Sequence, residues 1–521
     1  MLRAYPRGGP PAAPHGAISV FRAGQEAAER LVRLAAVDKA VAGARLRRLR
    51  EGRSLSQADL ARLLAISPSY LNQIEHGSRP LTVPVLMRIT ETFGVDPGFF
   101  AAQDPARLIA ELHEVFAEVT PELAVPAAEL ARLARDTPGA AEAVIALYRR
   151  YRQTSEHLAA ATGPASGAAG GSVGGAAGDS GYVPHEEVRD FFYRRHNHVA
   201  ELEERAEVLA AEIGVRRGEV RRALADRLRD AHGVRLARLD DSSIPAGDPR
   251  SAQASDLHRY DPAERVLRLA GHLRAGQQAF RMATQLAFLE HDELLDDLAR
   301  PVQPRARALT RIGLANYFAA ALILPYGEFH QAAEAFRYDI ERLADHFAVG
   351  FETAAHRLST LQRSAAPGVP FSFVRVDRAG NMSKRQSATG FHFSRGGGTC
   401  PLWTVYLAFS APGTVQRQVA SMPDGRRYLW IARTVTRGRG RWGAPGKMFA
   451  IGLGCEIRHA PRLVYATGLD LDDPAAATPI GAGCRVCERD DCAQRAFPRL
   501  GHDLAVTEDR STYVPYPVLP R

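Results

Sequence analysis

The chain has 521 residues, several times the length of one compact domain, so we expect about three or four folded units and not a single core. Lys and Arg number 67 against 58 Asp and Glu, and the formal charge of +9 suits a polyanionic partner but is equally typical of general solubility. Neither a run of about 18 uncharged apolar residues nor a secretory signal is apparent, which argues against a membrane protein and predicts a cytoplasmic one.

Composition divides the chain into segments. Residues 1–37 open with Pro and Gly and lack clear periodicity, which predicts a disordered tail. Residues 38–100 have apolar positions at helical spacing in short segments, and 101–162 continue as a helical connector. Residues 163–183 are an Ala/Gly/Ser run too poor in large apolar groups to bury a core, so we expect a flexible linker between two separable halves.

The segment from Gly43 to Val95 alternates helix and turn signals. Ser56 stands three residues before Asp59 and is placed to cap a short helix over residues 57–64. We expect the apolar face of this helix to consist of Leu60, Leu63 and Leu64.

A second helix is predicted over residues 68–76. Ser67 is its expected cap, Pro68 suits its first position, and Gly77 ends it. Leu71 and Ile74 must face the core, which turns four polar or aromatic residues partly or wholly outward, namely Ser69, Tyr70, Asn72 and Gln73. An outward Asn or Gln can pair bidentately with adenine in the major groove, so this helix has the chemistry of a DNA reader.

This pattern resembles the XRE family of Cro/repressor-like domains, S-Q-x-x-L-A-x-x-x-x-I-S-x-x-x-L-x-x-I-E-x-G-x-R-x-P, with His76 as one departure before the glycine. The resemblance implies that residues 68–76 form the recognition helix. The expected DNA contacts, including phosphate contacts, are Arg47, Arg48, Gln57, Ser67, Ser69, Tyr70, Asn72, Gln73 and Arg79. The alternative is a small helical domain that only mediates protein contacts.

Residues 184–365 are again dominated by helical patterns. Residues 278–289 and 314–325 resemble the paired helices of ImmA/IrrE-type metallopeptidases, in which H-E-x-x-H and a second-helix acid hold zinc beside a general base. In place of those groups the chain has Thr284, Gln285, Phe288 and Leu314. Two ordinary amphipathic helices would explain the periodicity as well. Either interpretation predicts no peptide hydrolysis.

Residues 366–521 change character to β-branched and aromatic runs divided by Gly, Pro and Asp, which predicts an α+β domain. The expected strand segments are 372–381, 390–394, 402–409, 426–435 and 447–457. The fold class is therefore a multidomain chain with an all-α helix-turn-helix N-terminal domain, a mostly α IrrE-like middle region and an α+β C-terminal domain.

All five cysteines lie beyond residue 399, and Cys484, Cys487 and Cys492 form a C-x2-C-x4-C arrangement. One loop can thus supply three thiolates to a metal centre in a reducing compartment. We expect Cys455 as the fourth ligand, with Cys400 as the other candidate but more typical of a core residue. Four thiolates suit tetrahedral zinc or an iron-sulfur cluster, and three from one loop fit a cluster somewhat better. Buried, inert thiols are the remaining alternative.

The order of these parts, ending in GCRVCERDDCAQRAFP, resembles the short-chain fatty-acyl transcriptional regulators of the RamB/PrpR type over most of residues 38–503. The resemblance implies control of acetate or propionate metabolism, an acyl-CoA effector and an iron-sulfur cluster of the 4Fe-4S kind. With it we expect a homodimer on a double-stranded operator and no catalytic residues. The competing function is a DNA-binding protein with a purely structural zinc site and no metabolite sensing.

A basic segment, residues 375–394, is a candidate contact for the phosphates or pantetheine arm of CoA. Its candidate residues are Arg378, Lys384, Arg385 and His392. A simple basic hairpin accounts for the same composition, and the sequence does not separate the two.

Overall fold

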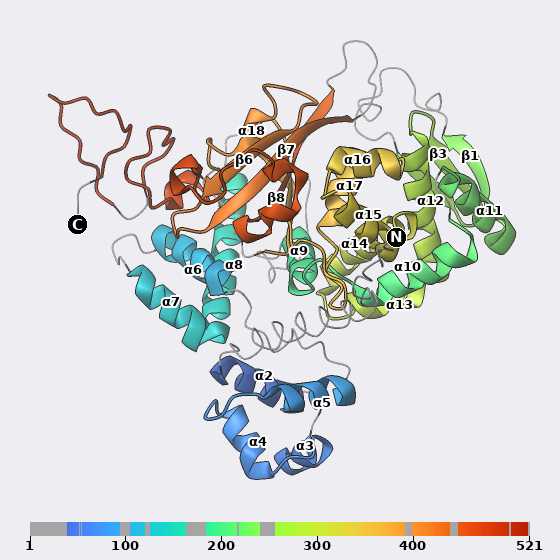
Figure 1. Ribbon diagram of the computed structural model, residues 1–521, viewed down its shortest axis with the longest axis horizontal. Helices are drawn as coiled ribbons and strands as arrows, with labels where there is room; N and C mark the ends of the chain where they lie inside the picture. The colour runs from blue at the N-terminus through green and yellow to red at the C-terminus, as the bar shows by residue number, and fades with distance from the viewer. Residues whose placement is uncertain are drawn as a thin grey trace, which may run out of the picture. The chain divides into compact units, whose positions relative to one another are not determined.

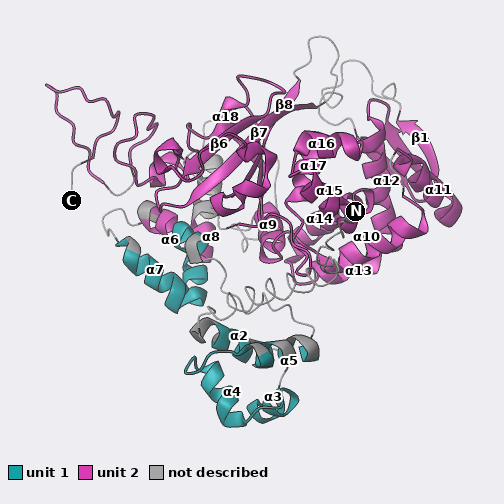
Figure 2. Ribbon diagram, viewed as in Figure 1, with its two compact units in different colours: residues 1–112, 125–144 teal, residues 113–124, 145–521 magenta. Residues whose placement is uncertain are grey.

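The computed structural model describes residues 39–93, 105–119, 125–162, 184–239, 256–391, 399–437, 446–499 and 502–518, apart from 52, 54, 216, 217 and 390. The predicted tail and the predicted linker lie outside these ranges. The described chain forms two compact units (Figure 2), one from residues 1–112 with 125–144 and the other from 113–124 with 145–521.

The first unit is built from helices (Figure 1). Four of them, α2 to α5, follow one another before residue 94, and three more, α6 to α8, follow residue 104. Their bounds are α2 (Lys39–Glu51), α3 (Gln57–Leu63), α4 (Pro68–Glu75), α5 (Val83–Phe93), α6 (Pro105–Val119), α7 (Ala127–Asp136) and α8 (Pro138–Thr162). Because α6 and α8 each cross a unit boundary, part of each belongs to the second unit.

The caps of α3 and α4 confirm the expected turn chemistry. The Ser56 hydroxyl accepts from the N–H of Asp59, and the Ser67 hydroxyl accepts from the N–H of Tyr70. The helices close around one apolar core, whose most buried members are Leu46, Leu60, Leu64, Leu71, Ile74 and Ile89. Leu63, expected in that core, is 51% exposed, and that prediction was wrong. Position 61 is instead the third inward residue of α3, because Leu60, Ala61 and Leu64 share one helix face.

Helices also form most of the second unit up to residue 358. They are α9 (Pro184–Arg194), α10 (Ala200–Glu212), α11 (Val220–His232), α12 (Ala275–Glu290), α13 (Asp292–Ala299), α14 (Pro304–Ile323), α15 (Tyr326–Ala335), α16 (Ile340–His346) and α17 (Phe351–Leu358). The apolar helix α14 is central, since α9, α10, α12, α13 and α17 all contact it. No single described helix is long and apolar enough to span a membrane, although α14 and α15 together reach that hydropathy across a 65° bend.

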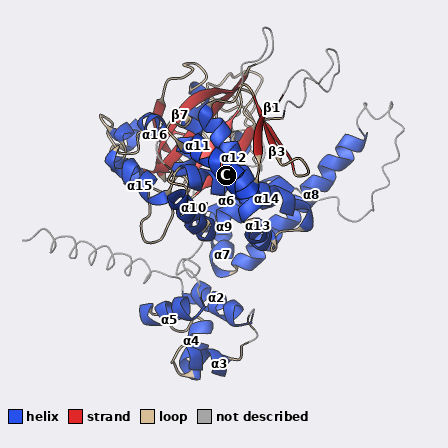
Figure 3. Cartoon of the chain, turned by 90° about the vertical axis from the view of Figure 1, so that its right-hand side faces the viewer, coloured by secondary structure: helices blue, strands red, loops and turns tan. Residues whose placement is uncertain are grey.

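A small sheet accompanies these helices, with strand order β1-β3-β2. The strands are β1 (Arg235–Leu239), β2 (His258–Asp261) and β3 (Val266–Ala270), with β1 parallel and β2 antiparallel to β3. Figure 3 shows the labelled strands β1 and β3 near α11 and α12, which contact them.

A six-stranded sheet with order β5-β4-β8-β7-β6-β9 forms the C-terminal part. Its strands are β4 (Ser372–Val376), β5 (Met382–Ser387), β6 (Gln416–Ser421), β7 (Arg427–Arg437), β8 (Lys447–Glu456) and β9 (Thr478–Pro479). One face joins the core of the helical region, and the other packs under the short helix α18 (Thr404–Leu407) and Trp403. Since successive residues of a strand face opposite sides, Leu429 and Trp430 of β7 belong to different cores.

The strand predictions have mixed outcomes. Segments 372–381, 426–435 and 447–457 contain β4, β7 and β8, whereas 402–409 contains α18 and no strand. That prediction was wrong because the segment's aromatic and β-branched residues pack on the sheet face from a helical turn. Segment 390–394 lies outside the described strands and mostly outside the described residues.

Candidate functional site

The N-terminal candidate site is α4 with the residues around it. Ser67, Ser69 and Asn72 are exposed, Tyr70 and Gln73 are half-buried, and Leu71 and Ile74 are fully buried. This alternation places the expected reader side chains outward from the core, as the sequence predicts.

A buried carboxylate fixes α4 against the two helices before it. Glu75 of α4, whose side chain is fully buried, accepts two hydrogen bonds from the guanidinium of Arg50 in α2, at 2.7 and 3.1 Å. The side-chain amide of Gln57, at the start of α3, donates to Glu75 at 2.8 Å and to Asn72 Oδ1 at 3.2 Å. Without DNA, Gln57 therefore orients Asn72, and its expected phosphate contact would use its free carbonyl oxygen or a rearranged amide.

The expected basic contacts lie on the outer surface of this domain. Arg47 is exposed and pairs with Glu51 one turn later at 2.8 Å. The exposed Arg79 places its guanidinium 5.5 Å from the ring centre of Tyr70. The side chain of Arg48 lies outside the described residues.

The positions that correspond to metallopeptidase ligands lie in the contact between two helices. Thr284 and Gln285 of α12 and Leu314 of α14 are all buried where these two helices pack together. The Thr284 hydroxyl donates to the carbonyl of Phe280 at 2.8 Å, a bond within its own helix. Because these side chains offer no imidazole or carboxylate, a zinc ion and a general base cannot be assembled from them.

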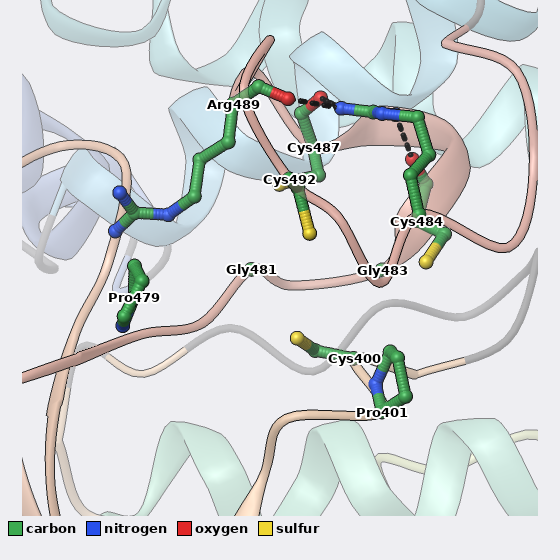
Figure 4. Close-up of a pocket in the computed structure, with 10 residues that line it drawn as sticks. Cys400, Pro401, Pro479, Gly481, Gly483, Cys484, Cys487, Arg489 and Cys492 are labelled. Carbon is green, nitrogen blue, oxygen red and sulfur yellow. Dashed lines mark hydrogen bonds between the residues drawn. The ribbon is translucent and has the colours of Figure 1, made fainter. Parts of the chain in front are cut away.

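The second candidate site is a pocket that brings two separate chain segments together. Cys400 lies in the segment before α18, whereas Cys484, Cys487 and Cys492 lie in the cysteine loop, which we define as residues 484–495. All four line the same pocket, and Figure 4 shows the Cys400 sulfur facing those of Cys484 and Cys492 across the enclosed space. The structure therefore brings Cys400 to three cysteines that lie 84 or more residues further along the chain.

Cys455, the expected fourth ligand, does not line this pocket, and Cys400 takes the place expected for it. Cys455 lies on β8, is fully buried and belongs to the apolar core shared with the helices. Cys400 belongs to the core on the opposite face of the sheet, which also contains Ile480 beside the cysteine loop. Nearness in sequence does not reveal which face of a strand a side chain occupies, so the sequence could not show that Cys400 and not Cys455 lines the pocket.

Two residues that the sequence interpretation missed organise the cysteine loop. Arg495 is 4% exposed, and its guanidinium donates to the carbonyls of Cys484 and Cys487 at 2.9 and 3.0 Å and to that of Arg489. A Cβ built on Gly481 would lie 2.6 Å from the Cys487 sulfur, so only glycine permits this close approach. The sequence carried a signal for both residues: the glycines of PIGAGC, and the arginine three residues after the last cysteine.

Burial and two arginines set the electrostatics of the pocket. Burial raises the pKa of the Cys400 and Cys487 thiols, while nearby backbone N–H groups oppose this at both and Arg489 and Arg495 oppose it at Cys487. Among the described residues Arg495 has no carboxylate within ion-pair distance, although its guanidinium is buried. Thiolates bound to a metal centre would supply the missing negative charge.

The four thiols do not converge on one point. In the described part of the chain, no three His, Cys, Asp or Glu side chains are arranged to hold a single metal ion. A zinc ion needs its sulfur ligands at about 2.3 Å, whereas a cluster of several irons places them around a larger body.

The expected effector residues are not brought together. Lys384 and Arg385 are neighbours on β5 and face opposite sides of the sheet. Arg385 pairs with Glu186 of α9 at 3.0 Å, and Arg378 lies exposed in the turn after β4. His392 lies outside the described residues. Lys384 and Arg385 therefore cannot hold the same phosphate group from one face of the sheet, and the effector set stays a prediction.

Three family models match successive parts of the chain, in the order predicted from the sequence. Residues 41–99 match a helix-turn-helix domain, 229–359 the IrrE N-terminal-like domain, and 360–516 the C-terminal domain described as "Short-chain fatty acyl coenzyme A regulator".

Two curated relatives come from Mycobacterium tuberculosis. HTH-type transcriptional regulator RamB is 55% identical over 485 residues, which cover 92% of this chain and 99% of RamB. HTH-type transcriptional regulator PrpR is 46% identical over 477 residues, covering 91% and 95%. A solved structure titled "Mycobacterium tuberculosis transcriptional regulator" is similar with a TM-score of 0.60 and 50% identity, over 64% of this chain and 99% of that one.

Proposed function

Because the chain belongs to the family of HTH-type transcriptional regulators that includes RamB and PrpR, we propose that it is a homodimeric operator-binding protein whose DNA affinity responds to an iron-sulfur cluster and a short-chain acyl-CoA. Transcriptional regulation, and not catalysis, is the activity of these relatives. The DNA part of the proposal rests on α4, whose exposed Asn72 and half-buried Gln73 are suited to major-groove base edges.

One observation supports the cluster above all others. Cys400 joins Cys484, Cys487 and Cys492 around one pocket that also has the buried Arg495 on its wall. These four cysteines would hold the cluster, and a bound cluster would supply reversible one-electron chemistry and a large, removable constraint on the loop. Backbone N–H groups beside Cys400 and Cys487 would donate to its sulfur ligands and stabilise the anionic form.

The acyl-CoA part rests on the match of residues 360–516 to the short-chain fatty acyl coenzyme A regulator family. No residue set is assigned to this effector, since Lys384 and Arg385 face opposite sides of the sheet.

The test uses full-length protein purified without oxygen. Iron, acid-labile sulfide and zinc are measured first, and DNA fragments are then selected from a genomic library to obtain an operator. Operator affinity is titrated with loaded and metal-stripped protein, each with and without acetyl-CoA or propionyl-CoA. We expect iron with sulfide and a changed affinity in the stripped protein. Stoichiometric zinc without iron, and an affinity indifferent to every addition, would favour the structural-zinc alternative.

A further inference from the structure

The cysteine loop contacts α6, the helix in which the boundary between the two units falls. Glu488 follows Cys487 directly, and its carboxylate lies 2.9 Å from the imidazole Nε2 of His113 on α6. Residues of α6 up to Leu112 cluster with the first unit, and His113 is the first residue that clusters with the second. α6 thus contains both His113, which contacts the cysteine loop, and residues that cluster with the unit of the helix-turn-helix.

The contact between His113 and Glu488 is partly shielded from solvent. The side chains of His113 and Glu488 are 27% and 42% exposed, so solvent screens the pair only in part. The position of the Glu488 carboxylate therefore decides whether the His113 imidazole keeps this contact.

The position of Glu488 depends on the state of the cysteine site. Arg495 holds the carbonyls of Cys484, Cys487 and Arg489, so the backbone on both sides of Glu488 is fixed only while the loop keeps this conformation. Thiolate ligands are strong constraints on such a loop, and their release leaves Arg495 as a buried cation without a counter-charge. Loss of the bound metal centre should therefore shift the loop backbone that carries Glu488.

We propose that the Glu488–His113 contact transmits occupancy of the four-cysteine pocket to α6 and so to operator affinity. This inference rests on the proposed function of that pocket. Coupling between two sites is reciprocal, so operator binding should also favour the loop conformation in which Glu488 meets His113. A measurable coupling corresponds to a change in operator affinity of about 5-fold or more between loaded and stripped protein.

The test compares full-length parent, Glu488→Gln, His113→Gln and Asp490→Asn. Asp490 is the matched control, because it lies two residues from Glu488 in the cysteine loop but pairs with Arg499 at 2.9 Å. For each protein, metal content and the visible spectrum are recorded, and operator affinity is titrated before and after anaerobic chelation. Hydrogen exchange of residues 105–119 is followed in both states as a readout independent of DNA.

We expect the parent and Asp490→Asn to show the same loaded-to-stripped affinity ratio and greater protection of α6 when loaded. Glu488→Gln and His113→Gln should keep their metal content, while the ratio falls to near 1 and the protection of α6 no longer depends on metal. A ratio that persists in both variants overturns this inference and leaves the proposed function standing. A parent whose operator affinity does not change on stripping overturns the sensing function and, with it, this inference.

Discussion

The buried ion pair between α10 and α17 allows a sharp prediction of stability. Glu203 and Arg357 have side-chain exposures of 1% and 0%, and they meet through two hydrogen bonds of 2.6 and 2.9 Å. The hydroxyl of Tyr317 donates to the same carboxylate at 2.6 Å. One turn further along α10, Glu207 pairs with Arg363 at 2.6 Å, but both side chains are about 30% exposed.

These two pairs should respond differently to the same change. Glu203→Ala leaves the charge of Arg357 buried and unpaired, which costs about 3–5 kcal/mol. Glu207→Ala removes a solvent-screened pair worth about 0–1 kcal/mol. With about 2–4 °C of melting temperature per kcal/mol, Glu203→Ala should lower Tm by roughly 10 °C and Glu207→Ala by at most a few degrees.

Thermal unfolding followed by circular dichroism at neutral pH measures both variants against the parent. The double variant Glu203→Leu with Arg357→Met, which replaces the pair by apolar groups, should recover most of the loss, because no charge is then left without a partner. Equal destabilisation by Glu203→Ala and Glu207→Ala would refute the reasoning from burial.

Three further predictions follow from the same structure. Gln73→Ala should lower discrimination between operator and random DNA by about 1–3 kcal/mol in a competition titration, and an unchanged ratio would remove Gln73 from the reader set. Gly481→Ala should reduce metal occupancy, because its Cβ would lie 2.6 Å from the Cys487 sulfur, and full iron content in the variant would contradict this. Burial would raise the pKa of Glu203, but Arg357 and Tyr317 lower it on balance, so its stabilisation is present at neutral pH and is lost as the pH falls through the lowered value. Melts across acidic pH should therefore show the difference between parent and Glu203→Ala shrinking.

The helix-turn-helix was predictable because its determinants are local. The caps at Ser56 and Ser67 and the inward positions Leu71 and Ile74 lie within one or two turns of the groups they contact. Leu63 was the exception, because only the packing of neighbouring helices decides where the apolar stripe ends.

The C-terminal sheet was predictable only in its central strands. β7 and β8 have the expected aromatic and β-branched residues, while β5 (MSKRQS) and β6 (QRQVAS) are polar, and their pairing depends on the strands beside them. The same limit applies to the cysteines. Spacing identified three members of the pocket, but the choice between Cys400 and Cys455 depends on which face of the sheet each residue meets.

The most direct test of the four-cysteine pocket is the iron and sulfide content of two anaerobically purified variants, Cys400→Ser and Cys455→Ser. Cys400 lines the pocket with the three loop cysteines, whereas Cys455 is buried in the opposite core. We predict that Cys400→Ser loses iron, sulfide and visible absorbance together, and that Cys455→Ser retains all three at the parent's level. Retention by Cys400→Ser with loss by Cys455→Ser would contradict the pocket assembled in this structure.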